Sequence, residues 1–242
     1  MSMKSCAGLT LAAIAMPASL AAAGPSPAQV SCVVLPNQHL NVASSVPGII
    51  RAVSVQRGDF VRAGQPLMRV ASDMESAQLK LAATKADMLR RKLARNAEAI
   101  QKHLISDQER DQLESDARLA QQEYEVARRA VAQKTTVSPI SGIVANRKAE
   151  PGQYAGTDPV FELVSLNPLR VELVFRVGAY GTIKRGQTVA IDLGPPVNGT
   201  RRGTVAIVDR VIDARSGTFG VRVNLPNADL KIPSGVACKA AL

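Results

Sequence analysis

Few residues of this chain have the types and spacing that catalysis requires. Its two histidines, His39 and His103, lie far apart in different segments. The sequence contains no H-E-x-x-H, G-x-S-x-G or G-x-x-x-x-G-K-[ST] motif, the signatures of metalloproteases, serine hydrolases and phosphate-binding loops. The acidic residues of segment 73–134 are distributed around helical faces and suggest no catalytic pair. We therefore predict a protein that is not an enzyme and that holds no cofactor or metal.

Residues 1–23 have the features of a secretory signal. Lys4 precedes an apolar run from Cys6 to Ala23 that contains Pro17 and ends in alanines. A basic start, a short apolar centre and a small-residue end are the parts of a cleavable signal peptide. The alternative is an uncleaved anchor, whereas the residues before Cys32 lack the pattern that lipidation requires. We expect the rest of the chain to be exported and to contain no further membrane span.

Export would place Cys32 and Cys238 in an oxidising compartment. They lie near opposite ends of the exported chain. One interpretation is that both are small buried hydrophobic residues. The other, which we favour, is a disulfide that ties the two ends together and stabilises the fold by shortening the unfolded chain's reach.

Two patterns of residue types predict the secondary structure of residues 46–134. From Val46 to Ser72, short apolar alternations interrupted by glycine and proline predict short strands. From Asp73 to Lys134 there is no glycine or proline, and good helix formers predominate. Apolar residues spaced by three and four form a first seam of Leu79, Ala82, Ala86, Leu89, Leu93, Asn96 and Ile100, and a second of Leu113, Ala117, Ala120, Tyr124, Ala127 and Val131.

Such narrow seams are typical of one helix packed against one other helix. Between them, Ser106 and Asp107 are candidate N-caps, and Glu109 stands three residues after Ser106 as in a capping box. We therefore predict an antiparallel coiled-coil hairpin over residues 73–137.

The strand pattern that precedes the hairpin returns after it. In the alignment of the two copies, Gly48 matches Gly142, Gly58 matches Gly152, and Phe60 matches Tyr154. This is an internal repeat of about 27 residues with the hairpin inserted between its copies. We predict that residues 46–72 and 138–166 pair into one small sheet domain.

The remaining segments predict further strands. Residues 24–45 are expected to form an N-terminal segment and a first strand. Residues 167–242 are rich in β-branched residues, with turn signals such as Gly194-Pro195-Pro196, and predict an antiparallel β-barrel.

A repeated glycine-rich strand motif split by a helical hairpin and followed by a barrel resembles the periplasmic adaptor, or membrane fusion, family of the HlyD type. The repeats are similar to the halves of a biotinyl-lipoyl domain, and residues 211–236 are similar to the family's barrel ending. The resemblance covers nearly the whole exported chain and includes adaptor subunits of RND efflux pumps. It implies an elongated multi-domain protein that combines a split lipoyl-like domain, a coiled-coil hairpin and a β-barrel.

The resemblance also implies function and partners. The chain would act in the periplasm as the adaptor of a tripartite efflux or secretion system, associated with the inner membrane through an RND or ABC transporter. Its other partner would be a TolC-like outer-membrane channel, and the adaptor would assemble into a ring, usually of six. The alternative is an exported coiled-coil scaffold or binding protein that works without a transporter.

The hairpin tip is where the resemblance implies docking to the outer-membrane channel. Adaptors that dock in this way carry an Arg, a Leu four residues later and a Ser seven residues after that. Arg95 and Ser106 stand at this spacing, but Ala99 occupies the middle position. The residues expected to dock are Arg95, Ala99, Ile100, Leu104, Ile105 and Ser106. The alternative is that Arg95 is an ordinary solvated charge and Ser106 only a helix cap.

The sequence departs from larger family members at its end. Those members continue past the barrel into a membrane-proximal domain built from both termini. Because this sequence ends soon after its last predicted strand, we expect that domain to be reduced or absent, with the residues around Cys32 and Cys238 as its remnant.

The net charge of +10 raises nucleic acid or an anionic membrane as partners. The hairpin is nearly neutral, and the excess lies in the two β-regions without a dense basic block. Aromatic residues make up only 3% of the chain, which disfavours binding by base stacking. We expect the basic surface to face anionic lipid headgroups or an acidic transporter surface, and not nucleic acid.

Overall fold

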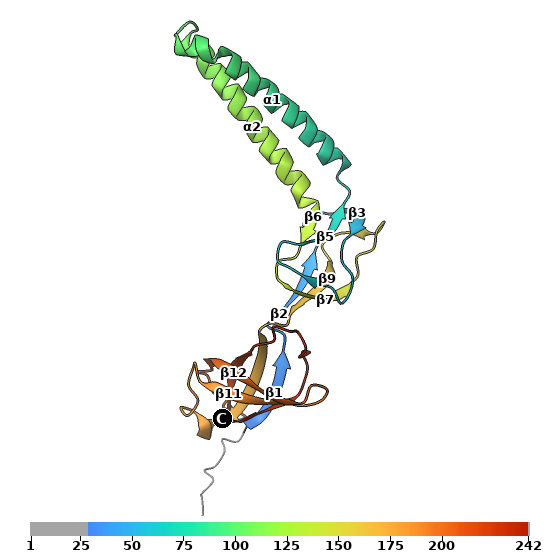
Figure 1. Ribbon diagram of the computed structural model, residues 1–242, viewed down its shortest axis with the longest axis vertical. Coiled ribbons are helices and arrows are strands. Elements are labelled where there is room, and N and C mark those ends of the chain that lie inside the picture. The colour runs from blue at the N-terminus through green and yellow to red at the C-terminus, as the bar shows by residue number, and fades with distance from the viewer. Residues whose placement is uncertain (1–28, 242) are drawn as a thin grey trace, which may run out of the picture.

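The computed structural model of this chain describes residues 29–241 and has an elongated shape (Figure 1). A six-stranded barrel lies at one end, a domain of two four-stranded sheets lies in the middle, and a helical hairpin forms the other end. The chain runs from the barrel to the hairpin tip and back, so both ends of the described chain lie in the barrel. The predicted signal, residues 1–23, lies outside the described residues.

The hairpin consists of α1 (Asp73–Gln101) and α2 (Asp107–Gln133). At 1.5 Å per residue, α1 is about 43 Å long. The two helices run side by side and antiparallel (Figure 1), and Lys85 of α1 forms an ion pair of 2.7 Å with Glu123 of α2. Every residue of the two predicted seams is buried or half-buried, and the seam alanines let the helices approach closely. The predicted pairing of two helices is therefore confirmed.

A second ion pair closes the base of the hairpin. Nζ of Lys134, directly after α2, lies 2.8 Å from a carboxylate oxygen of Glu75 in the first turn of α1. The hydrogen bond from Lys134 favours the charged carboxylate and lowers the pKa of Glu75 below its usual range. The deprotonated carboxylate of Glu75 therefore stabilises the folded hairpin relative to the unfolded chain.

We expect Glu75→Gln to lower the melting temperature of the hairpin at pH 7 but not at pH about 2. Because the folded pKa is lowered, the stabilisation is present above the ordinary carboxyl pKa and is lost as the pH falls through the folded value. Thermal melts followed by helical circular dichroism across this range test it. Glu98→Gln is the matched control, since Glu98 pairs with Lys102 of the same arm. A difference from wild type that persisted unchanged at pH 2 would contradict the prediction.

The middle domain contains two sheets, and both copies of the repeat contribute strands to each of them. One sheet has the order β2 (Gln38–Ala43), β9 (Pro159–Ser165), β7 (Gly142–Arg147) and β4 (Phe60–Val61). The other has the order β6 (Thr135–Val137), β5 (Pro66–Val70), β3 (Gly48–Val53) and β8 (Tyr154–Ala155). Glycine turns divide each repeat copy into several short strands, so one copy contributes to both sheets.

The two copies exchange their shortest strands in a symmetric way. β4 of the first copy pairs with β7 of the second, with Phe60 opposite Ile143. β8 of the second copy pairs with β3 of the first, with Tyr154 opposite Ile49. These four residues occupy equivalent positions in the two copies, so the alignment of the repeat is confirmed in space.

The segment at residues 24–45 contributes two strands rather than one. β1 (Gln29–Leu35) belongs to the barrel, where it pairs with β10 (Leu169–Arg176). After Pro36, which has no backbone N–H to donate, the chain turns and enters the middle domain as β2. The chain therefore crosses between barrel and middle domain twice, once here and once between β9 and β10.

The barrel is an antiparallel sheet that nearly closes on itself. Its strand order is β1, β10, β13 (Thr218–Leu225), β12 (Gly199–Val208), β11 (Thr188–Leu193) and β14 (Cys238–Ala241), with a short 3₁₀ helix at Val177–Ala179 after β10. Alternate side chains of β10 and β13 are buried in its core, as a sheet with one packed face requires. The edges meet where the Val34 N–H donates to the Val236 carbonyl at 3.0 Å.

A disulfide joins the two edge strands of the barrel. Cys32 lies on β1 and Cys238 on β14, their Cα atoms are 5.1 Å apart, and 206 residues of sequence separate them. Both cysteines are thus part of the barrel. The expectation that they form the remnant of a separate membrane-proximal domain is wrong, because β1 and β14 lie together to complete the barrel.

Candidate functional site

The turn between α1 and α2 forms the end of the molecule that is farthest from the barrel (Figure 1). His103 adopts a left-handed backbone conformation with φ of 52°, which commonly ends a helix. The N–H of the next residue, Leu104, donates to the Ala99 carbonyl at 2.9 Å. The chain therefore reverses direction within a short, hydrogen-bonded turn.

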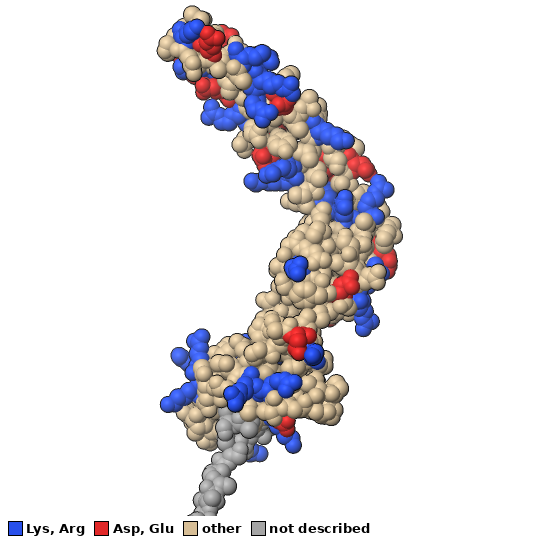
Figure 2. Space-filling view, viewed as in Figure 1, with Lys and Arg blue, Asp and Glu red and all other residues tan. Residues whose placement is uncertain are grey.

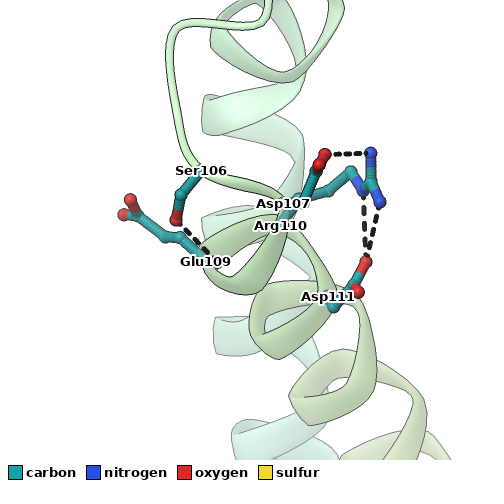
Figure 3. A network of polar contacts seen from close by, with 5 residues as sticks. All are labelled: Ser106, Asp107, Glu109, Arg110 and Asp111. Carbon is teal, nitrogen blue, oxygen red and sulfur yellow. Dashed lines mark hydrogen bonds and ion pairs between the residues drawn. The ribbon is translucent and has the colours of Figure 1, made fainter.

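Ser106 begins α2 by capping it, as the sequence predicted. Its Oγ accepts a hydrogen bond of 3.1 Å from the backbone N–H of Glu109 (Figure 3). The side chain of Glu109 points away from Ser106, so the cap is made from one side only. Removing a serine cap of this kind costs about 1 kcal/mol.

A small charge network stiffens the same turn of α2. The Arg110 guanidinium lies between two carboxylates, at 2.9 Å from Asp107 and 3.0 Å from Asp111 (Figure 3). The hydrogen bond to Asp111, with the charges of both carboxylates, raises the pKa of Arg110. The turn is therefore held by its own contacts.

Most of the predicted docking residues lie at or beside the turn, whereas Arg95 lies lower on α1. Ala99 and Leu104 meet through the backbone bond at the turn, and Ile100 and Ile105 are their neighbours in sequence. Leu104 is 72% exposed, whereas Ile100 and Ile105 are half-buried. Arg95 is exposed on α1, about 9 Å from the end of the helix along its axis. The turn thus presents one prominent apolar side chain, with a cation on the shaft below it.

Sequence reasoning missed an apolar groove along the shaft of the hairpin. Leu81 of α1 and Leu119 and Val126 of α2 are all exposed, and the groove between the helices also contains the buried Ala82 and Ala127. These residues lie at the border of the predicted seams. The signal that would have found them is the seven-residue spacing of Leu119 and Val126, which puts both on one side of α2.

The middle domain exposes two further apolar positions. Phe60 is 50% exposed beside Ile143, and Tyr154 is 64% exposed beside Ile49. Because the two pairs are related by the repeat, they give the domain two separate apolar surface patches, one on each of its sheets.

Within residues 29–241, no three His, Cys, Asp or Glu side chains are grouped so that they could hold a metal ion. Nε2 of His39 lies 2.6 Å from the carboxylate of Glu162 on the neighbouring strand.

Neither helix of the described chain combines the length and the apolar character that crossing a membrane requires.

A barrel, a split-repeat domain and a helical hairpin with an exposed tip define the class of membrane fusion, or adaptor, proteins. The model of one family, the CzcB-like barrel-sandwich hybrid domain, matches residues 38–164, which include the middle domain and the whole hairpin. The chain belongs to this family. The resemblance predicted from the sequence is therefore confirmed, and the family is one of adaptors and not of enzymes.

Two relatives and one solved structure show how far the similarity extends. The chain is 28% identical over 229 residues to the nickel-cobalt-cadmium resistance protein NccB of Alcaligenes xylosoxydans xylosoxydans, covering 83% of this chain and 57% of that one. It is 25% identical over 213 residues to the multidrug resistance protein MdtA of Pectobacterium carotovorum, covering 78% and 52%. The chain thus spans about half the length of the curated relatives it matches.

The solved structure is a MacA–MexA chimeric protein that contains the α-hairpin domain of Pseudomonas aeruginosa MexA. It matches with a TM-score of 0.72 at 16% identity, over 89% of this chain and 80% of the chimera. At this identity the match establishes the shared fold of barrel, middle domain and hairpin.

Proposed function

We propose that this chain is the periplasmic adaptor subunit of a tripartite efflux or secretion system. It bridges an inner-membrane transporter, of RND or ABC type, and a TolC-like outer-membrane duct. The observation that carries the proposal is the exposed Leu104 at the hairpin tip, at the end of the molecule farthest from the barrel. An exposed leucine on a preformed turn is a feature that docking would bury and that a free monomer does not need.

The polarity of the molecule follows from its two ends. The hairpin tip docks on the duct, with Leu104, Ile105 and Ile100 as the apolar contacts and Arg95 as a cation on the shaft. Ala99 lies beneath the turn, and Ser106 acts first as the cap of α2. The barrel is left to face the transporter and the inner membrane.

We further propose that the adaptor forms a ring, of six subunits. A ring needs two different surfaces on each subunit that fit one another. The two patches of the middle domain, around Phe60 and around Tyr154, supply two such surfaces, and the groove lined by Leu81 and Val126 supplies an apolar face for a neighbouring hairpin. The antiparallel coiled coil would then be one element of a tubular bundle.

The docking proposal predicts the effect of a charge at the tip. We expect Leu104→Asp to weaken duct binding roughly 30-fold or more, because it removes an apolar contact and places a carboxylate without a partner in the interface. Ser106 is retained, since its replacement would also uncap α2. Cross-linking of the tip to the duct in cells, together with export of a toxic substrate, provides the measurement.

Met74→Asp is the matched control for this variant. Met74 is also an exposed apolar residue of the hairpin, but it lies at the base, in the first turn of α1. It should leave duct cross-linking unchanged. Equal cross-linking by both variants would refute docking through the tip. If the chain purified from the envelope brought down neither a transporter nor a duct, the result would favour an exported scaffold that acts without them.

A further inference from the structure

The barrel has one end that carries exposed apolar and basic side chains together. Two segments form it: the chain after β10, from Arg176 to Gln187, and the end of β12 with the turn that follows it. We define the distal barrel surface by Tyr180, Lys184, Arg185, Ile207, Arg210 and Val211, all of which are exposed. A shallow hollow lies between the two segments.

Strand register places this surface at the end of the barrel that points away from the middle domain. β10 starts at Leu169, just after the link from the middle domain, and ends at Arg176, opposite Thr218 of β13. The backbone of Gln29, where the described chain begins, lies opposite Phe175. The segment that precedes Gln29 therefore reaches the barrel at this same end.

Within residues 29–241, the basic residues at this end have no ionic partner. They are Arg176, Lys184, Arg185, Arg210 and Arg215, and none forms an ion pair with any residue of the part of the chain that the structure describes. Two acids, Asp209 and Asp213, lie in the same segments. Lys and Arg predominate over Asp and Glu across the barrel on the face drawn in Figure 2. The surface is thus positively charged and free to pair with an external anion.

Asp213 stabilises the turn over residues 213–218, which follows β12. Its carboxylate accepts hydrogen bonds from the backbone N–H groups of Arg215 at 2.8 Å and Ser216 at 3.4 Å. Backbone pairing of Asp213 with Thr218 closes the same turn. The turn over residues 213–218 therefore holds a fixed shape, and Val211, two residues before it, is 82% exposed.

Tyr180 is positioned by the barrel core. Its ring packs edge-on against buried Phe219 with 5.2 Å between ring centres, and yet the residue remains exposed. A tyrosine with one apolar side against protein and its other side in solvent suits the boundary between water and lipid. Arg210 and Val211 are a second feature suited to this boundary, because a cation lies next to an exposed apolar side chain in the sequence.

We propose that the distal barrel surface binds directly to a membrane surface that contains anionic phospholipid. Lys184, Arg185 and Arg210 pair with headgroup phosphates, while Val211 and Tyr180 enter the headgroup layer. The chain outside the structure favours this occupant, because residues 24–28 span at most about 18 Å between the predicted signal and the barrel. Whenever the signal lies in the inner membrane, this end of the barrel is held beside it. The proposal rests on the proposed periplasmic location, and it requires no transporter.

Vesicle binding tests the proposal with the exported chain, every variant having the same N-terminus. Vesicles of phosphatidylcholine are compared with vesicles that also contain phosphatidylglycerol. Binding through a retained anchor would occur with both kinds of vesicle, whereas binding through the distal barrel surface should occur only with the anionic ones. We expect the wild type to bind the anionic vesicles selectively and less tightly as salt is raised. Lys184→Gln with Arg185→Gln should weaken this binding about 30-fold, since each basic residue near an anionic surface adds about fivefold in affinity.

Arg201→Gln with Arg202→Gln is the matched control. This pair is also basic, exposed and consecutive, but it lies on β12 about 20 Å along the strand from Ile207. It should weaken binding less than about threefold, because the pair lies beyond the screening length of physiological salt from the bound surface. Val211→Asp tests the apolar contact at a side chain with no packing role, and it should weaken binding more than Val211→Ser.

Two results would overturn the proposal. One is an equal loss of vesicle binding in the Lys184 and Arg185 double variant and in the Arg201 and Arg202 control. The other is vesicle binding that does not depend on phosphatidylglycerol. If the Lys184 and Arg185 variant lost a co-purifying transporter while vesicle binding was absent in the wild type, the surface would belong to a protein partner. Because the vesicles contain neither transporter nor duct, this test can fail while the docking test at Leu104 succeeds, and the reverse.

Discussion

Replacing Cys32 and Cys238 together by alanine is expected to lower the free energy of unfolding of the barrel by about 3–5 kcal/mol. The disulfide closes a loop of 206 residues in the unfolded chain, which is nearly the whole described protein. In the chain-entropy model, a longer closed loop gives a larger stabilisation. The bond also joins the two edge strands of the barrel, β1 and β14, so its loss releases the place where the barrel closes.

Urea unfolding of the exported protein, with hydrogen exchange read from peptides of β10 and β13, measures this loss. Reducing the wild type should reproduce the effect of the double substitution. The double variant itself should not respond to the reductant, which separates the disulfide from other actions of the reagent. If the barrel strands of the variant and of the wild type unfolded at the same urea concentration, the stabilising role would be refuted.

Gly142→Ala is expected to destabilise the middle domain by about 2–4 kcal/mol. A methyl group at Gly142 would meet the backbone of β9, with the carbonyl carbon of Val164 at 2.8 Å and the Cα of Ser165 at 3.2 Å. Backbone atoms of a paired strand cannot move aside without breaking the β7–β9 pairing. The neighbouring strand of the same sheet would therefore have to shift.

Gly48 offers a control from the same repeat position. A methyl group there would lie 3.3 Å from the Cβ of Val70, which is a side-chain atom rather than backbone. We expect Gly48→Ala to cost less than about 1 kcal/mol, since a small adjustment of Val70 relieves the contact. Denaturant unfolding of the two variants gives the comparison, and equal losses would show that the close backbone approach at Gly142 is not the cause.

The same pair of glycines shows where prediction from sequence reaches its limit. The repeat could be read from the spacing of glycines and from Phe60 and Tyr154, because turns and aromatic positions recur at fixed offsets. What the spacing does not contain is how closely each glycine approaches its neighbouring strand. Gly142 lies against the backbone of β9, whereas the nearest neighbour of Gly48 is a side chain of β5, the equivalent strand of the other copy, so equivalent residues acquire unequal constraints.

The hairpin was the most predictable element, since its seams and the cap at Ser106 are local patterns. The strands of residues 29–43 were less predictable, because a strand's partner depends on distant sequence: β1 pairs with β10 and β2 with β9. At the tip, exposure could be expected for Leu104, but the half-buried state of Ile105 depends on how the turn folds back. The distal barrel surface was visible only as diffuse charge until the fold brought residues 180–185 and 207–211 together.

Both helices of the hairpin are attached to one sheet at their base, and this attachment allows the length of the molecule to vary. β5 leads into α1 and β6 follows α2, and these two strands pair with each other, so both ends of the hairpin are fixed in one sheet. The tip makes its turn from its own contacts. Residues can therefore be added in equal number to both arms without altering either the sheet below or the turn above.

Seven residues in each arm would lengthen the shaft by about 10 Å while preserving the repeat of its seams. The hairpin is thus an adjustable spacer, and the reach of the protein can change without redesign of the surfaces at its two ends.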